Sequence, residues 1–226
     1  MFVEGLTEQE FVITLVKDLV GARGLNIEIK RQYKNVLIVE ASQQVGNQEF
    51  YLLLVNCAND EQVLTKIRDN YAGLVAGGYD AILGLRDLFP LAATELGFLQ
   101  SGIAASTPIG EIPVEVHIAV METEAWFIAE STHFERISPN LSSAAIAAAG
   151  INLTGIPVES IAHPAETLDK IYKIVGARYL TRDGKKSGSR IKRTVRALSV
   201  EGLYVTVRAN VPEFAKFLNS IERAFF

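Results

Sequence analysis

The sequence is poor in the residue types that build disulfide frameworks, zinc sites and nucleophilic triads. Its 226 residues include one cysteine, Cys57, and three histidines. A single cysteine excludes an intrachain disulfide and suits a reducing compartment, so we expect a cytoplasmic protein with a buried, inert thiol. His117, His133 and His163 have no metal-ligand spacing and form no set with Cys57 or a serine. We therefore predict neither a zinc site nor a Ser-His-Asp triad.

Long apolar runs of the kind that cross membranes are also missing. Residues 137–158 carry no charge, but Pro139, Asn140, Asn152 and Pro157 make this stretch too polar and too broken for a membrane span. Acidic side chains near the start of the chain occupy the region that is basic and then apolar in a secretory signal. We expect a protein without a membrane partner.

The charges are unevenly distributed along the chain. Residues 1–177 carry 11 Lys/Arg against 22 Asp/Glu, whereas residues 178–196 carry eight basic side chains against Asp183 alone. Residues 197–226 are balanced, with three of each sign. The basic segment favours contact with a polyanion, and its alternative interpretation is a solvated charged face.

Alternating strand and helix patterns predict a mainly parallel sheet flanked by helices. Thr7 and Glu10 have the spacing of a capping box at the start of the first helix. The helices are expected at 8–21 and 60–75 and directly after Glu122, and the strands at 1–3, 26–33, 36–41, 49–56, 79–85 and 114–121. The class is therefore α/β.

The chain after Pro139 has a different, helical pattern. An alanine-rich segment, AAIAAA, is followed by helical patterns at 164–177, 190–198 and 212–225. We predict an α/β domain over residues 1–136 and a helical C-terminal part over residues 137–226 that packs on it.

Acidic residues follow three of the predicted strands. Glu4 follows FV, Asp87 follows ILGLR, and Glu122 and Glu124 follow IAVM. The carboxyl ends of parallel strands lie along one sheet edge, so these side chains can converge. Converging carboxylates repel one another, and a divalent cation with oxygen ligands, such as Mg²⁺, removes that repulsion. The alternative is that these residues only cap the helices that follow.

Several segments resemble a known family. FVEGLTEQEF is similar to the opening motif of Toprim domains, the metal-binding catalytic fold of topoisomerases, primases and overcoming-lysogenization-defect nucleases. RDLFP, VEVHIAVMETEAWFIAE, AHPAETLDKIYK and VPEFAKFLNSIE resemble, in that order, an uncharacterised bacterial family of Toprim-like proteins. The resemblance covers nearly the whole chain and implies a Toprim-like sheet.

The resemblance also implies roles for individual residues. Glu4 matches the Toprim glutamate, a general acid or base that contacts the metal, and Asp87 matches one member of an Asp-x-Asp pair. Glu122 and Glu124 match an acidic pair before a helix. The first Asp of the Asp-x-Asp pair is replaced by Leu85. Either Glu122 or Glu124 supplies the lost ligand, or the metal site is degenerate and the domain only binds.

The basic segment provides candidate nucleic-acid contacts. Ile191 and Val195 predict the inward face of a helix, and the preceding loop, DGKKSGS, is basic. The candidate phosphate-binding side chains are Lys185, Lys186, Arg190, Lys192, Arg193 and Arg196. Cations that hold a phosphate backbone and carboxylates that hold a metal are the two requirements of phosphodiester chemistry.

Two functions are compatible with these features. The first is a nuclease or phosphotransfer protein that depends on Mg²⁺ or Mn²⁺ and acts on nucleic acid. The family resemblance implies a role in defence against mobile elements or in DNA maintenance, beside a partner ATPase. The second is a non-catalytic regulatory module that binds nucleic acid or a partner through a degenerate Toprim site.

Overall fold

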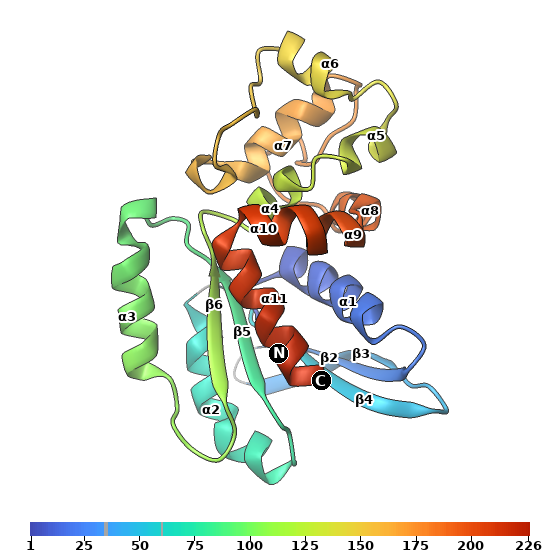
Figure 1. Cartoon of the computed structure of the whole chain (residues 1–226). Coiled ribbons are helices and arrows are strands. Elements are labelled where there is room, and N and C mark those ends of the chain that lie inside the picture. The colour runs from blue at the N-terminus through green and yellow to red at the C-terminus, as the bar shows by residue number, and fades with distance from the viewer. Residues whose placement is uncertain (34–35, 60) are drawn as a thin grey trace. The chain divides into compact units, whose positions relative to one another are not determined.

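The computed structural model describes residues 1–33, 36–59 and 61–226. Within these ranges the chain forms two compact units (Figure 1). The first consists of Met1–Asp87, Glu95–Ile118 and Lys216–Phe226, and the second of Leu88–Thr94 and Ala119–Ala215. The sequence predicts one boundary, after residue 136. Each of these units instead combines segments that are separate in the sequence.

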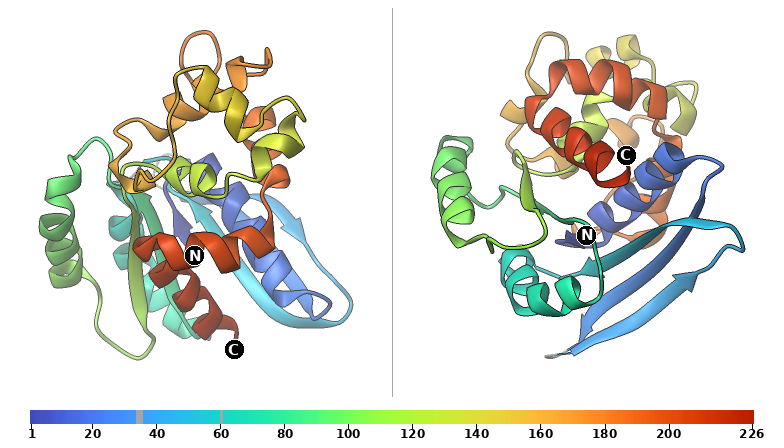
Figure 2. Two further views of the ribbon diagram at one scale, coloured as in Figure 1. Left: turned by 45° about the horizontal axis from the view of Figure 1, so that its top comes forward. Right: turned by 60° about the horizontal axis from the view of Figure 1, so that its bottom comes forward.

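A six-stranded sheet is the centre of the first unit. The strands lie in the order β3-β2-β4-β1-β5-β6, and β1 is parallel to both β4 and β5. Strand β2 is parallel to β4 and antiparallel to β3, with which it forms a long ribbon (Figure 2). The strands are β1 Phe2–Val3, β2 Gly24–Tyr33, β3 Val36–Gln43, β4 Gln48–Asn56, β5 Ile82–Asp87 and β6 Val114–Ala119. The predicted α/β class with a mainly parallel sheet is confirmed.

Helices α1 (Leu6–Val20) and α2 (Gln62–Ala76) cover opposite faces of this sheet (Figure 1). Helix α1 packs on β2 and β4, and α2 packs on β1 and β5. The side chains of a strand alternate between its two faces, so the consecutive buried residues of β4 contribute to the core on both faces of the sheet. Gly84 lets α2 approach β5 closely, because a Cβ atom there would lie 3.0 Å from Ile67 Cδ1.

The first helix begins two residues earlier than predicted. Gly5 is the N-cap, and its N–H donates to Glu8 Oε2 at 2.9 Å. Glu8 therefore occupies the capping position that the sequence pattern assigned to Glu10. The predicted start of the second helix at Asp60 lies outside the described residues.

The second unit is helical. Trp126 is fully buried and packs against Phe214, with ring centroids 5.2 Å apart, as expected for a core residue. His133, also fully buried, is within hydrogen-bond distance of the Tyr172 hydroxyl, at 3.0 Å. The α-helices of the second unit are α4 Glu124–Ala129, α5 His133–Ile137, α6 Ser143–Ala148, α7 Pro164–Lys173, α8 Gly188–Ala197, α9 Val200–Gly202 and α10 Arg208–Asn210. The π-helical turn η3 spans Leu203–Val207.

Two further helices contribute to the first unit. Helix α3 (Leu96–Ser106) belongs to the first unit, and the C-terminal helix α11 (Pro212–Phe225) contributes its residues from Lys216 onward to the same unit. There Phe217 packs on His117 of β6, with ring centroids 5.5 Å apart. Across the described ranges, no helix combines the length and hydropathy that a membrane crossing requires.

Candidate metal centre

The candidate centre lies where strands β5 and β6 end. The Leu88 N–H donates to the Ala119 carbonyl at 2.9 Å, and the Phe89 N–H donates to the Met121 carbonyl at 2.8 Å. These two bonds hold the segments after both strands side by side. Asp87 comes directly before the bonded residues of the first segment, and Glu122 directly follows those of the second. The backbone pairing therefore brings both acidic residues to the same end of the strands, as the sequence predicts.

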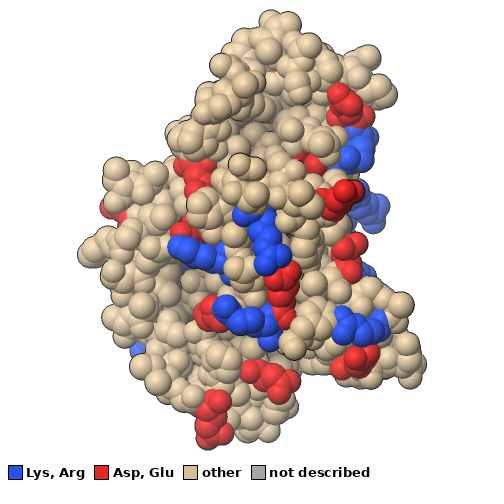
Figure 3. Space-filling model, viewed as in Figure 1, with Lys and Arg blue, Asp and Glu red and all other residues tan. Residues whose placement is uncertain are grey.

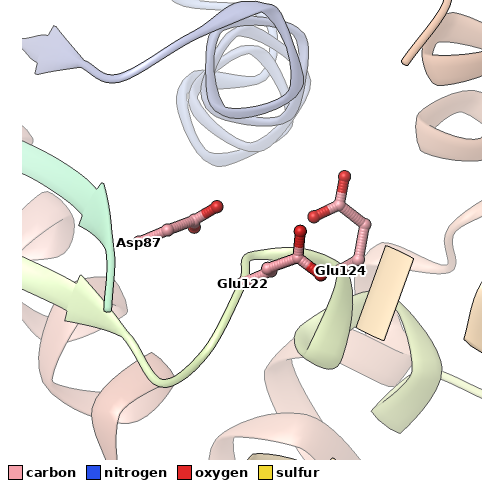
Figure 4. A group of neighbouring side chains, drawn as sticks. All are labelled: Asp87, Glu122 and Glu124. Carbon is pink, nitrogen blue, oxygen red and sulfur yellow. The ribbon is translucent and has the colours of Figure 1, made fainter. Parts of the chain in front are cut away.

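Three carboxylates come together at this end. One ligand oxygen from each of Asp87, Glu122 and Glu124 lies within 4.8 Å of the other two (Figure 4). Asp87 and Glu124 are buried, and Glu122 is half-buried. Figure 4 shows that Asp87 comes from the end of β5, whereas the two glutamates come from the turn and helix after β6.

A sharp turn directs the two glutamates. Met121 has a φ of 62°, in the left-handed region that non-glycine residues rarely adopt. Helix α4 starts immediately after this turn, and the Ala125 N–H donates to the Glu122 carbonyl at 2.9 Å. Strained backbone of this kind persists where the surrounding structure holds it, and it clusters at functional sites. The turn places Glu122 and Glu124 at the start of one short helix.

Glu124 is the most enclosed of the three. Its side chain is 0% exposed. The Tyr179 hydroxyl donates to Glu124 Oε1 at 2.6 Å, and Lys186 Nζ lies 2.8 Å from Oε1 and 3.0 Å from Oε2. Both carboxylate oxygens thus have a donor, and an ammonium balances the charge that burial would otherwise make costly.

Glu122 has a different set of partners. Its Oε2 accepts a hydrogen bond from the N–H of Ala165, in the first turn of α7, at 2.8 Å, and its Oε1 lies 3.8 Å from Lys186 Nζ. Burial raises the pKa of the Glu122 carboxyl, the neighbouring Glu124 raises it further, and Lys186 opposes both effects. A bound cation would reduce the repulsion between these two adjacent carboxylates.

Glu4 lies beside Asp87 but outside the group of three. Glu4 Oε2 accepts a hydrogen bond from the Asp87 N–H at 2.9 Å, and the Glu4 N–H donates to the Leu85 carbonyl at 3.2 Å. Arg86 Nε donates to the Asp87 carbonyl at 3.2 Å. Glu4 therefore braces the end of β5 through the backbone of Asp87.

Leu85 is a core residue in this structure. It is 0% exposed and pairs in register with Val3 of β1. The position that the Toprim resemblance assigns to the first Asp of an Asp-x-Asp pair is therefore filled by an apolar side chain. The carboxylates that the structure groups with that of Asp87 are those of Glu122 and Glu124.

The donor set fits a hard divalent cation. Oxygen ligands lie about 2.1 Å from Mg²⁺, so they are separated by about 3 Å when adjacent and about 4.2 Å when opposite. The 4.8 Å span of the three carboxylates is close to these values, and small side-chain rotations reach them. Asp87, Glu122 and Glu124 are thus able to hold a metal ion.

The predicted nucleic-acid contacts have mixed surroundings. Arg190 donates to the Leu180 carbonyl, and Arg193 donates to the Arg178 carbonyl at 2.6 Å. The other four predicted side chains are Lys185, 80% exposed and paired with Asp183 at 3.4 Å, Lys186 on Glu124, and the exposed Lys192 and Arg196. On the face drawn in Figure 3, basic and acidic side chains lie next to one another.

Sequence patterns do not indicate the contacts of Tyr179 and Lys186 with Glu124. Lys186 is predicted from its basic neighbours as a phosphate ligand, whereas the structure places its ammonium on a carboxylate 62 residues away. Tyr179 carries no signal, because a tyrosine before a leucine is ordinary core sequence. Comparison with protein-family models, curated proteins and solved structures gave no match. The Toprim resemblance therefore remains an expectation from the motifs.

Proposed function

We propose that the protein is a nuclease or related phosphotransfer protein that uses Mg²⁺ or Mn²⁺ and acts on nucleic acid. The observation that carries this proposal is the convergence of Asp87, Glu122 and Glu124 within 4.8 Å at the ends of two strands. A divalent cation bound there activates water and stabilises negative charge on a phosphodiester. The motif resemblance to Toprim domains supports the same chemistry.

The chain's own residues have separable roles in this proposal. Asp87, Glu122 and Glu124 hold the cation, and Glu4 keeps the end of β5 in place through the Asp87 N–H. The exposed cations of α8 and its preceding loop, among them Lys185, Lys192 and Arg196, hold the phosphate backbone. On the family resemblance, the physiological setting is cytoplasmic defence against mobile elements, beside a partner ATPase.

A second function is favoured by Leu85 and Lys186. The buried Leu85 removes one ligand of the Asp-x-Asp pair, and Lys186 already neutralises Glu124 without a metal. In this alternative the domain binds nucleic acid or a partner protein and catalyses nothing. The two functions differ in whether the carboxylates are needed for a reaction.

Cleavage of defined substrates tests the proposal. Purified protein is incubated with supercoiled plasmid, single-stranded circular DNA and single-stranded RNA, in Mg²⁺, Mn²⁺ or EDTA. We expect cleavage that needs the metal and is lost in Asp87→Asn and Glu122→Gln. Asp80→Asn is the matched control, because Asp80 is exposed and comes just before the opposite end of the same strand. Glu4→Gln separately tests the predicted acid-base role.

The outcomes separate the two functions. Cleavage of equal rate in all variants would identify a contaminant and reject the catalytic proposal. Retention of nucleic acid that weakens steeply with salt, without cleavage in either metal, would establish the binding module instead. Absence of both cleavage and binding would reject both functions.

A further inference from the structure

Lys186 is placed where a cation has to be if Glu122 and Glu124 are both ionised. Its Nζ lies 2.8 Å from Glu124 Oε1 and 3.8 Å from Glu122 Oε1. We propose that Lys186 is a tethered cation that competes with the divalent metal for this glutamate pair and thereby sets the metal affinity of the centre. This inference rests on the proposed function, because it concerns the same carboxylates.

Competition follows from the occupancy of the oxygens. Glu124 Oε1 accepts from Tyr179 and Lys186, and Oε2 accepts from Lys186. A metal on either oxygen would come within a few ångströms of the ammonium, where two cations in a half-buried site repel strongly. Lys186 and the metal therefore exclude each other at Glu124, whereas the neutral Tyr179 hydroxyl can stay in place with either cation.

The segment around Lys186 allows the ammonium to leave without unfolding. The backbone is fixed by a bridge between Leu180 and Lys186 and by the Thr181 N–H, which donates to the Lys185 carbonyl at 2.8 Å. The Lys186 side chain is itself 32% exposed and has four rotatable bonds. Rotation of the side chain moves the charge into solvent while the loop keeps its shape.

This arrangement gives Lys186 a defined role when metal is scarce. The ammonium balances the charge of the fully buried Glu124, so the centre stays assembled without a metal. Its cost is a weaker apparent metal affinity, since each binding event must first break the ion pair.

Mn²⁺ titration by calorimetry tests the competition directly, without an activity readout. Wild type is compared with Lys186→Met, which removes the charge, and with Lys186→Arg, which keeps it. Lys185→Met is the matched control, because Lys185 is the adjacent lysine and lies outside the glutamate pair. We expect Lys186→Met to bind Mn²⁺ about tenfold more tightly or better, since a charged hydrogen bond no longer has to be broken. The other two variants should keep the wild-type affinity within about threefold.

The results distinguish failure of this inference from failure of the proposed function. Equal Mn²⁺ affinity in wild type and Lys186→Met, abolished by Glu122→Gln, would overturn the competition and leave the metal site intact. No Mn²⁺ binding by Lys186→Met would overturn both. If Lys186→Met does not fold, Lys186→Gln replaces it, because Gln keeps a hydrogen-bond donor without the charge.

Discussion

The ion pair between Lys186 and Glu124 makes a strong prediction about stability. At 2.8 Å the Coulomb attraction of two unit charges is about 6 kcal/mol at an effective dielectric of 20, before desolvation is subtracted. Breaking a buried pair on one side typically costs 3–5 kcal/mol, because the remaining charge is uncompensated. Lys186 is partly exposed, which reduces this figure. We expect Lys186→Met to lower the free energy of unfolding by about 2–3 kcal/mol in EDTA.

A double-mutant cycle isolates the interaction. Glu124→Gln removes the carboxylate charge, so Lys186→Met should cost much less in that background. The coupling energy between the two positions should then be about 1–3 kcal/mol. Urea unfolding is followed by the fluorescence of Trp126, the chain's single tryptophan, which is buried two residues after Glu124 in α4. The probe therefore reports on the unit that contains both mutated residues.

Two results would refute the reasoning. A coupling energy below about 0.5 kcal/mol would mean that the pair contributes nothing to the folded state. A loss of stability as large for Lys185→Met as for Lys186→Met would mean that loop charge in general, and not the contact with Glu124, is responsible. Added Mn²⁺ provides a further check, since it should restore stability to Lys186→Met in proportion to its occupancy of the site.

Three further predictions concern residues outside the ion pair. Burial lowers the pKa of His133 to about 4, so folded His133 stays neutral while the unfolded chain binds a proton below pH 6.5. Stability should fall by about 3 kcal/mol between pH 6.5 and pH 4, and His133→Gln should flatten this slope in urea unfolding. Leu85→Asp should lower the unfolding free energy at pH 7 by at least about 3 kcal/mol, with a smaller loss at pH 4 where the carboxyl is neutral. Burial raises the pKa of the Cys57 thiol to about 12. A thiol reagent at pH 8 should therefore react roughly 1,000-fold faster in urea than with the folded protein.

Each of these predictions has an outcome that contradicts it. An unchanged acid slope in His133→Gln would show that other groups control the pH dependence. Wild-type stability of Leu85→Asp together with tighter Mn²⁺ binding would show that the Asp-x-Asp pair can be rebuilt. Rapid modification of Cys57 in the folded protein, with Trp126 fluorescence unchanged, would show that the thiol is accessible.

Most of the sheet could be predicted because its strands differ so clearly in burial. The continuously apolar FYLLLVN corresponds to the central strand β4, and the alternating IEIKRQY corresponds to β2, which is partly exposed. The segment between the helices predicted at 190–198 and 212–225 could not be predicted. Its segment LYVTV is rich in β-branched residues, which favour strands, yet it forms the π-helical turn η3 because packing in the second unit overrides local preference.

The candidate site likewise has a part that could be predicted from the sequence and a part that could not. The acidic residues at strand ends could be found, because parallel strands bring their carboxyl ends to one edge whatever their separation in sequence. That Glu4 binds the Asp87 N–H could not be anticipated, since strand position alone does not specify which atoms meet. The contacts of Tyr179 and Lys186 with Glu124 depend on tertiary packing of segments with no shared pattern.

The contacts of Glu124 also have a consequence for how such sequences can diverge. One short segment, from Tyr179 to Lys186, supplies both the hydroxyl and the ammonium that Glu124 requires. A chain that loses Glu124 no longer needs either donor, and a chain that loses Lys186 first is left with a buried charge. The three positions should therefore change together among descendants of this sequence.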